Sequence, residues 1–307
     1  MLDWDDLRVF LACARAGSFK EGAARLRIDA TTVARRVQRL EDALRFTLFV
    51  RTSRGLQLTA AGAQLVGAGQ GVESAVEAIH EQHASTAATG TVRVSVSEGF
   101  GTHVLAPAVP ALLDSRPGLQ LELVANAGFL SASSREVDIA VTLAPPRSSR
   151  LSVERLTDYH LGLYASPEYL ARARRPATVE GLPDHHLVGY IDDLLYAPEL
   201  RYLEDIHPDL RVRTSSSSIR AQLELTRAGV GLCVLPHFIV RPTDGLERVL
   251  AHEVNLERAF WISVHRDLLE TRRIRAVRQW LAETVAGHAH ALRPQRSQVG
   301  LATSDSR

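Results

Sequence analysis

The hydrophobic period of this chain changes once, near residue 90, and the change separates two kinds of structure. Before it, apolar residues recur every three or four positions, as in Leu7–Ala14, which is typical of amphipathic helices. After it they alternate, first in Thr91–Ser97 (TVRVSVS), which indicates a strand. Similar strand patterns recur at 119–125, 137–143, 229–235 and 259–265. Because helical patterns separate these strands, we expect an α/β body with a largely parallel sheet.

Composition places this α/β body behind a basic head. The chain has 307 residues, more than one typical domain of about 100–150 residues. Residues 1–58 hold 11 basic and 7 acidic side chains, a net charge of +4, whereas the remaining residues carry −3. A basic module joined to a mildly acidic body favours a polyanion as the partner of the head.

Several classes of protein are disfavoured by the same sequence. No apolar run approaches 18 residues, so we expect no transmembrane helix and no membrane partner. The acidic start MLDWDDLRVF is unlike a signal peptide. Cys13 and Cys233 lie far apart within apolar runs, which argues against a disulfide or a cysteine metal site. We therefore expect a cytoplasmic protein.

Two short helices follow the first one, and their boundaries are visible in the sequence. Gly17 ends the first helix, and Ser18 with Glu21 fits a capping box for the second. Asp29 can cap a third helix, in which Val33, Val37, Leu40 and Leu44 form one narrow apolar stripe. The opposite face carries Thr31, Thr32, Arg35, Arg36 and Arg39. This arrangement predicts a helix-turn-helix at about residues 19–38.

An arginine-bearing helix face can be merely solvated, but the next segment favours DNA. Residues 46–58 (FTLFVRTSRGLQL) read as a two-stranded ribbon with a basic turn, which is the pattern of a wing. Arginine contacts phosphate and guanine, and threonine can reach phosphates or base edges. The candidate contacts to double-stranded DNA are Ser18, Thr31, Thr32, Arg35, Arg36, Arg39, Arg51 and Arg54.

The N-terminal motifs together resemble one known family. LRVFLACARAGSFKEGAARL, VARRVQRLEDAL and LFVRTSRGLQLTAAG are similar to the DNA-binding domain of LysR-type transcriptional regulators over residues 3–62. One departure concerns the start of the recognition helix, where the family usually carries a Ser-Gln pair. Here Asp29 and Ala30 stand in its place, so the glutamine that could read an adenine edge is absent.

The segment after the ribbon reads as a connector. Residues 60–83 form an approximate helical stripe despite Gly67, Gly69 and Gly71, each of which weakens helix propensity by up to about 1 kcal/mol. Pairing with a partner helix would stabilise such a segment. His80 and His83 could be a metal pair, but without further ligands they indicate a polar face. Small residues at 85–90 indicate a hinge.

The body resembles the effector-binding half of the same family through LYASPEYL, VDIAV, RAGVGLCVLPHFI and WISVHRDLLETRRIRAVRQWLAE. The resemblance implies a two-lobed fold like that of a periplasmic binding protein. The expected organisation is a winged helix-turn-helix domain (1–59), a linker helix and hinge (60–88), an effector domain (89–292) and a disordered tail (293–307). Lobe I is expected at about 89–162 and 265–292, and lobe II at about 163–264.

Ligands in such sheets bind outside the carboxyl ends of strands. The end of the first strand is therefore the best cleft candidate, and polar residues after other strands could face it. Glu98 leaves the charge of the ligand open, because a carboxylate would repel an acidic ligand and could pair with an amine. Ordinary capping and turn roles remain an alternative for each residue. The candidate effector contacts are Ser97, Glu98, Phe100, Thr102, Asn126, Ser215, Ser216 and Ser217.

The sequence thus predicts a regulator that binds promoter DNA as a homodimer or homotetramer and responds to a small-molecule effector. Two other classes compete with it: a solute-binding protein without DNA contact, and an enzyme with an accessory binding head. His185-His186 and Asp192-Asp193 complete no catalytic or metal spacing. We expect no enzymatic activity, no cofactor and no metal.

Overall fold

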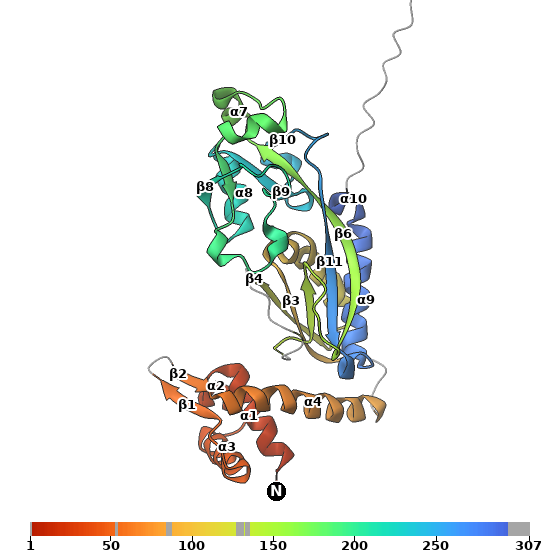
Figure 1. Ribbon diagram of the computed structural model, residues 1–307. Coiled ribbons are helices and arrows are strands. Elements are labelled where there is room, and N and C mark those ends of the chain that lie inside the picture. Colours follow the sequence, from red (N-terminus) through yellow and green to blue (C-terminus); the bar gives the residue numbers. More distant parts are fainter. Residues whose placement is uncertain (1, 53–54, 84–87, 127–131, 133–135, 294–307) are drawn as a thin grey trace, which may run out of the picture.

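The computed structural model describes residues 2–52, 55–83, 88–126, 132 and 136–293. It consists of a helical N-terminal module, one long helix, and an elongated α/β body (Figure 1). Within the described residues, no helix has both the length and the apolarity that a membrane crossing requires. Most of the tail expected at 293–307 and part of the hinge expected at 85–90 lie outside the described residues.

The N-terminal module holds three helices and a ribbon: α1 (Trp4–Ala16), α2 (Phe19–Leu26), α3 (Ala30–Leu44), β1 (Phe49–Thr52) and β2 (Gly55–Leu58). Local capping sets the helix boundaries. Gly17 ends α1 at a φ of 69° and donates its backbone N–H to Cys13. The Ser18 hydroxyl then accepts a hydrogen bond from the Glu21 backbone N–H at 3.1 Å, which begins α2.

Packing of apolar faces closes this module. Leu7, Phe10 and Leu11 of α1 are buried against the stripe of α3. Phe49 of the antiparallel ribbon adds its ring to the same core, with ring centroids 5.2 Å from Phe10 and 5.6 Å from Phe19. Leu56 and Leu58 of β2 pack against this core as well, so both strands fix the ribbon to the helices.

The long helix α4 (Ala60–His83) packs against α1 of its own chain. A side chain at Gly69 would place its Cβ 3.1 Å from Leu7 and from Leu11, so glycine permits the close approach of the two helices. An Arg15–Glu73 ion pair joins them further along. Val72, which the sequence places in the apolar stripe, is 44% exposed. The side chains of His80 and His83 lie outside the described part of the chain.

The body contains two lobes built on one sheet. Lobe I holds β3 (Gly90–Ser97), α5 (Glu98–Phe100), the π-helix η1 (Gly101–Leu105), α6 (Ala106–Ser115), β4 (Leu119–Asn126), β5 (Ile139–Thr142), the turn η7 (Arg266–Leu268), α9 (Arg272–Gly287) and α10 (Ala289–Leu292). Lobe II holds α7 (Pro167–Ala173), η2 (Val179–Asp184), β7 (Leu187–Gly189), η3 (Asp192–Leu194), η4 (Pro198–Leu200), β8 (Val212–Ser215), α8 (Ile219–Arg227), β9 (Leu232–Pro236), η5 (His237–Ile239), η6 (Pro242–Asp244) and β10 (Glu247–Val249).

Two long strands, β6 (Leu151–Ala165) and β11 (Leu256–His265), run through both lobes (Figure 1). The strand order is β4-β3-β5-β11-β6-β9-β7-β8, with β10 on β6. Pairing is parallel among β3, β4 and β5 and among β7, β8 and β9. However, β6 and β11 are antiparallel to each other and to their neighbours. The expectation of a largely parallel sheet holds only inside each lobe, because the chain enters lobe II on one strand and returns on the other.

Among the glycines of the N-terminal module whose surroundings the structure describes, Gly62 leaves the least room for a side chain. The Thr59 hydroxyl accepts a hydrogen bond from the Gly62 backbone N–H at 2.9 Å and donates one to the Thr47 carbonyl at 2.7 Å. A Cβ on Gly62 would lie 2.2 Å from the Leu48 carbonyl oxygen. The Leu-Thr-x-x-Gly sequence thus holds the start of α4 against the ribbon.

Gly62→Ala is expected to lower the free energy of unfolding of the N-terminal module by about 1–3 kcal/mol, because the backbone must move to admit the methyl group. Helix propensity alone would stabilise the variant by about 1 kcal/mol. Urea unfolding followed by circular dichroism measures the difference. Gly287→Ala is the control, since nothing lies within 4 Å of a Cβ there. Equal or higher stability of Gly62→Ala would contradict this account of the contact.

Candidate nucleic-acid interface and effector site

Helix α3 presents its polar face because its apolar face is buried. Val33, Val37 and Leu40 are at most 2% exposed. Asp29 begins the helix by accepting a hydrogen bond from the Thr31 backbone N–H at 2.7 Å. The Thr31 hydroxyl also donates to this carboxylate, and these bonds lower the pKa of Asp29. Asp29 therefore stays ionised as the cap of the helix.

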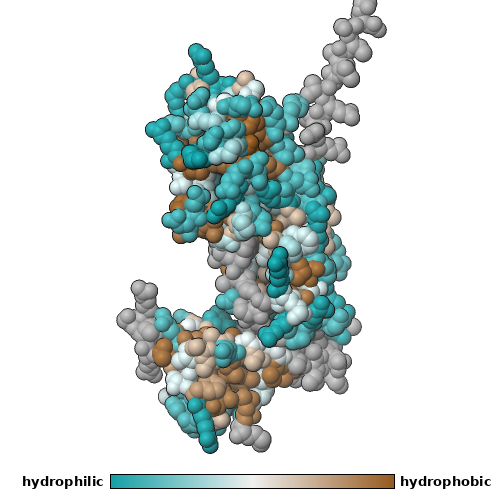
Figure 2. Space-filling model, viewed as in Figure 1, coloured by the Kyte–Doolittle hydropathy of each residue, from teal (hydrophilic) through white to brown (hydrophobic). Residues whose placement is uncertain are grey.

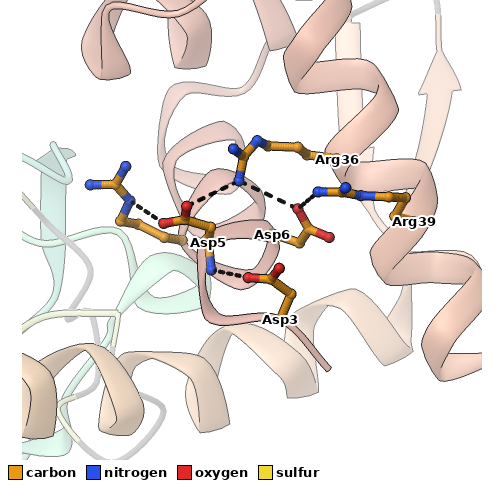
Figure 3. Close-up of polar contacts among 6 residues, drawn as sticks. Asp3, Asp5, Asp6, Arg36 and Arg39 are labelled. Carbon is orange, nitrogen blue, oxygen red and sulfur yellow. Dashed lines mark hydrogen bonds and ion pairs between the residues drawn. The ribbon is translucent and has the colours of Figure 1, made fainter. Parts of the chain in front are cut away.

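The arginines of α3 differ sharply in their surroundings. Figure 3 shows Arg36 and Arg39 pointing toward carboxylates of α1. Arg36 Nη1 lies 3.3 Å from an Asp5 carboxylate oxygen and 3.6 Å from one of Asp6. Arg39 Nη2 donates to the same Asp6 oxygen at 2.5 Å. Arg35 is exposed and has no ion-pair partner among the described residues. Two arginines of the predicted DNA face are therefore already paired with carboxylates of α1.

The remaining predicted DNA contacts have various positions. Thr32 is half-buried beside the arginines, and Ser18 is occupied as the cap of α2. Arg51 lies on β1, but its side chain is outside the described part of the chain, and Arg54 lies outside it entirely. Sequence reasoning did not include Asp5 and Asp6. The signal was the DWDD run at the start of α1, which lies against α3 only in the folded domain.

In the body, Glu98 joins the two lobes. It follows β3 of lobe I, and its carboxylate accepts hydrogen bonds from the Ser218 hydroxyl at 2.9 Å and the Ile219 backbone N–H at 3.0 Å. Both donors belong to the start of α8 in lobe II. A carboxylate is stabilised at a helix N-terminus, where free N–H groups point at it. Glu98 is thus partnered within the chain.

The hollow between the lobes is small and lined by aromatic rings. Its volume is about 20 Å³, room for about one water molecule. Tyr159 and Phe260 stack there with centroids 4.3 Å apart, and Phe100 packs on Phe260 at the same distance. Tyr196 lines the same hollow. Its burial is the main cause, and the nearby Glu98 charge the second cause, that raises the pKa of Tyr196 to about 12. Tyr196 therefore remains a neutral phenol at ordinary pH.

A larger cavity of about 350 Å³ adjoins this hollow inside lobe II. The two share Tyr190, Leu200 and Tyr202 as a common wall. Most of its lining comes from residues 190–211, and β7, β8 and β9 each add a valine. The lining carries charges of both signs, including Asp192 and Arg211. Volumes of roughly 300–1,000 Å³ are typical of small-molecule sites.

The predicted effector residues divide between these surfaces. Ser97, Glu98, Phe100 and Ser217 line the small hollow. Thr102 lies on η1, and Ser215 and Ser216 lie in and after β8; none of the three is among the described residues lining either cavity. Asn126 ends β4, and its side chain is outside the described part of the chain. The prediction omitted the tyrosines at 190, 196 and 202, although their regular spacing is visible in the sequence.

Comparison with known proteins decides the family. The model "LysR substrate binding domain" matches residues 85–286, and "Bacterial regulatory helix-turn-helix protein, lysR family" matches residues 4–63. The chain belongs to the LysR-type transcriptional regulators. Its family is one of DNA-binding regulators with an effector-binding domain, not of enzymes.

Two relatives of this LysR-type regulator cover most of its length or somewhat less. It is 30% identical to the Mau operon transcriptional activator of Paracoccus denitrificans over 94% of this chain and 100% of that protein. It is 32% identical to the HTH-type transcriptional regulator CrgA of Neisseria meningitidis over 61% of this chain and 64% of that protein.

Solved structures support the fold. The CrgA structure covers 92% of this chain and 99% of its own, with 26% identity and a TM-score of 0.57. A full-length OxyR variant from Pseudomonas aeruginosa matches 93% of this chain and 98% of its own, with a TM-score of 0.72 and 20% identity. The predicted fold class, a winged helix-turn-helix followed by a two-lobed α/β domain, is confirmed.

Glu98→Gln is expected to lower the melting temperature of the effector domain by several degrees. The substitution removes the charge from two hydrogen bonds, each of which contributes about 1.5–3 kcal/mol when the acceptor is charged. A loss of about 1 kcal/mol lowers the melting temperature of a domain of this size by roughly 2–4 °C. Differential scanning calorimetry measures the effect. Glu270→Gln, on a side chain 89% exposed, is the control. An unchanged melting temperature would mean that the Glu98 contact contributes nothing to the resting arrangement.

Proposed function

We propose that this LysR-type regulator binds promoter DNA as a homodimer or homotetramer, with the polar face of α3 in the major groove. The observation that carries the proposal is that Thr31 and Arg35 are exposed on the face of α3 opposite its buried apolar stripe. Each protomer would read one half-site, about 34 Å from the next. We place the protein in the cytoplasm because the DNA that it binds is there.

The surface of the N-terminal module supports association of protomers. Figure 2 shows apolar residues gathered on its visible face, over α1 and the adjoining part of α4. Val72 of α4 is among the exposed large apolar residues. Apolar surface of this kind is buried when helices of two protomers pair. This favours a symmetric oligomer over a solute-binding protein that acts alone.

The effector is proposed to bind where the small hollow meets the larger cavity of lobe II. The hollow alone is too small for a metabolite, whereas the adjoining cavity has a suitable volume. Displacement of Tyr190 and Tyr202, their common wall, would join the two. The ligand would then contact Ser97, Phe100 and Ser217 as well as the apolar lining.

One buried side chain connects this cavity to the contact between the lobes. Gln222 of α8 lines the cavity, is 1% exposed, and donates from Nε2 to the Ser216 carbonyl at 3.0 Å. The loop that begins at Ser216 also carries Ser218, which holds Glu98. A ligand that binds one arrangement of this loop more tightly would shift the lobes and the attached DNA heads.

Arg35→Ala is expected to weaken DNA binding about five- to tenfold near 0.1 M salt, because one phosphate or base contact is lost. The logarithmic salt slope should fall in magnitude by about one. Fluorescence anisotropy with a duplex selected by the unaltered protein from a random-sequence pool measures both. Arg227→Ala on α8 is the matched control. Unchanged binding by Arg35→Ala would remove the α3 face from the DNA contact.

Two tryptophan substitutions locate the effector. A panel of small carboxylates, amines and aromatic compounds is screened for thermal stabilisation of the full chain. A ligand present at 100 times its Kd stabilises the folded protein by about 2.7 kcal/mol. Leu203→Trp in the larger cavity and Ser217→Trp in the hollow should each abolish the shift. Leu194→Trp, exposed and outside the described lining of both, should retain it. If only Leu203→Trp abolished the thermal shift, the ligand would bind within lobe II alone.

A further inference from the structure

The carboxylates of Asp5 and Asp6 lie where a DNA-binding domain would least be expected to carry negative charge. They begin α1 and face Arg36 and Arg39, two arginines of the recognition helix α3 (Figure 3). The formal charges of these four side chains cancel, and Asp5 also lies 3.8 Å from Arg8 of its own helix. Asp6 contacts both arginines through one oxygen, and its side chain is only 5% exposed. A carboxylate held at this depth requires such partners.

The geometry leaves part of each guanidinium available. A guanidinium has five N–H donors, and Arg39 uses one nitrogen, Nη2, toward Asp6. The Arg39 side chain remains 53% exposed, whereas that of Arg36 is 28% exposed. A carboxylate on one side of an arginine fixes the direction of its free edge, and recognition of guanine needs two parallel donors in a fixed direction.

The same pairing lowers the attraction of these arginines for phosphate. Non-specific affinity for DNA comes from cations that neutralise phosphates and release counterions. An arginine that already has a carboxylate at 2.5 Å gains less from a phosphate, because it must share or exchange its partner. The phosphate-driven affinity for DNA of any sequence therefore falls. A correctly placed base edge can still accept hydrogen bonds from the free N–H groups of the two arginines.

We propose that Asp6, assisted by Asp5, is a specificity-determining positioning residue, which orients Arg39 and Arg36 toward base edges and suppresses their binding to random DNA. This inference rests on the proposed role of the α3 face. Asp6 acts through the arginines and touches no DNA itself. Removing its charge should therefore strengthen non-specific binding and weaken discrimination, whereas removal of a residue that only stabilises the fold would weaken both.

Asp6→Asn tests this inference in the full chain. Its affinity is measured for the duplex selected by the unaltered protein and for poly(dI-dC), by anisotropy across a salt series. The Kd for poly(dI-dC) should fall about fivefold, with a salt slope about 0.9 steeper for one added phosphate contact. The affinity for the selected duplex relative to that for poly(dI-dC) should fall about tenfold. Duplexes selected by the variant should lose preference at one or two base pairs.

Asp3→Asn is the matched control. Asp3 carries the same charge three residues away, caps α1 through the Asp5 backbone N–H, and asparagine retains that cap. It should change both affinities less than twofold. Asp6→Glu keeps the charge and should retain most of the discrimination, and thermal melting verifies that each variant is folded.

Two results would overturn the inference. One is an Asp6→Asn protein whose affinities match those of Asp3→Asn, since net charge alone would then act. The other is an equal weakening on both DNAs with no loss of discrimination, which would make Asp6 purely structural. If Asp6→Asn unfolds, the decision passes to Asp5→Asn, which should show the same changes at smaller size. Failure of Arg35→Ala to weaken binding would instead contradict the proposed function.

Discussion

The antiparallel pairing of β6 with β11 is the constraint on which the effector domain depends. These two strands carry the chain into lobe II and back, and they are hydrogen-bonded along their length, from Leu256 opposite Leu161 to His265 opposite Leu151. The lobes therefore belong to one sheet and cannot separate without bending it. The register shifts between Phe260 and Trp261, where the pairing passes from one lobe to the other. A bulge of this kind locally bends and twists a strand.

The hollow between the lobes lies at this same place. Tyr159 of β6 and Phe260 of β11 stack on each other beside the register shift. Glu98 closes the hollow by holding the start of α8. The ring stack, the register shift and the Glu98 contact thus all lie at the junction of the two lobes.

Both candidate sites contain charged side chains that are already paired within the chain. Glu98 is held by donors of α8, and Arg36 and Arg39 are held by Asp5 and Asp6. A ligand that replaced one of these internal partners would gain less free energy than its new contact alone provides. Among the described residues Arg35 has no such ion pair, so the α3 face combines one unpaired arginine with two paired ones.

Several features of this protein could be predicted from its sequence because they depend on interactions between residues close together in the chain. The caps Gly17, Ser18 and Asp29 and the apolar stripe of α3 act within a few residues, so the sequence alone determined where the recognition helix lies and which face it exposes. The alternating period after residue 90 likewise predicted β3, β4, β5, β9 and β11, but β6, β7 and β10 were not among the predicted strands. Only the tertiary structure decided that β6 and β11 run antiparallel, that Glu98 reaches α8, and that Asp5 and Asp6 meet α3. These contacts join residues 30 to 121 positions apart. No local period or cap encodes which distant carboxylate a given arginine or helix end will meet.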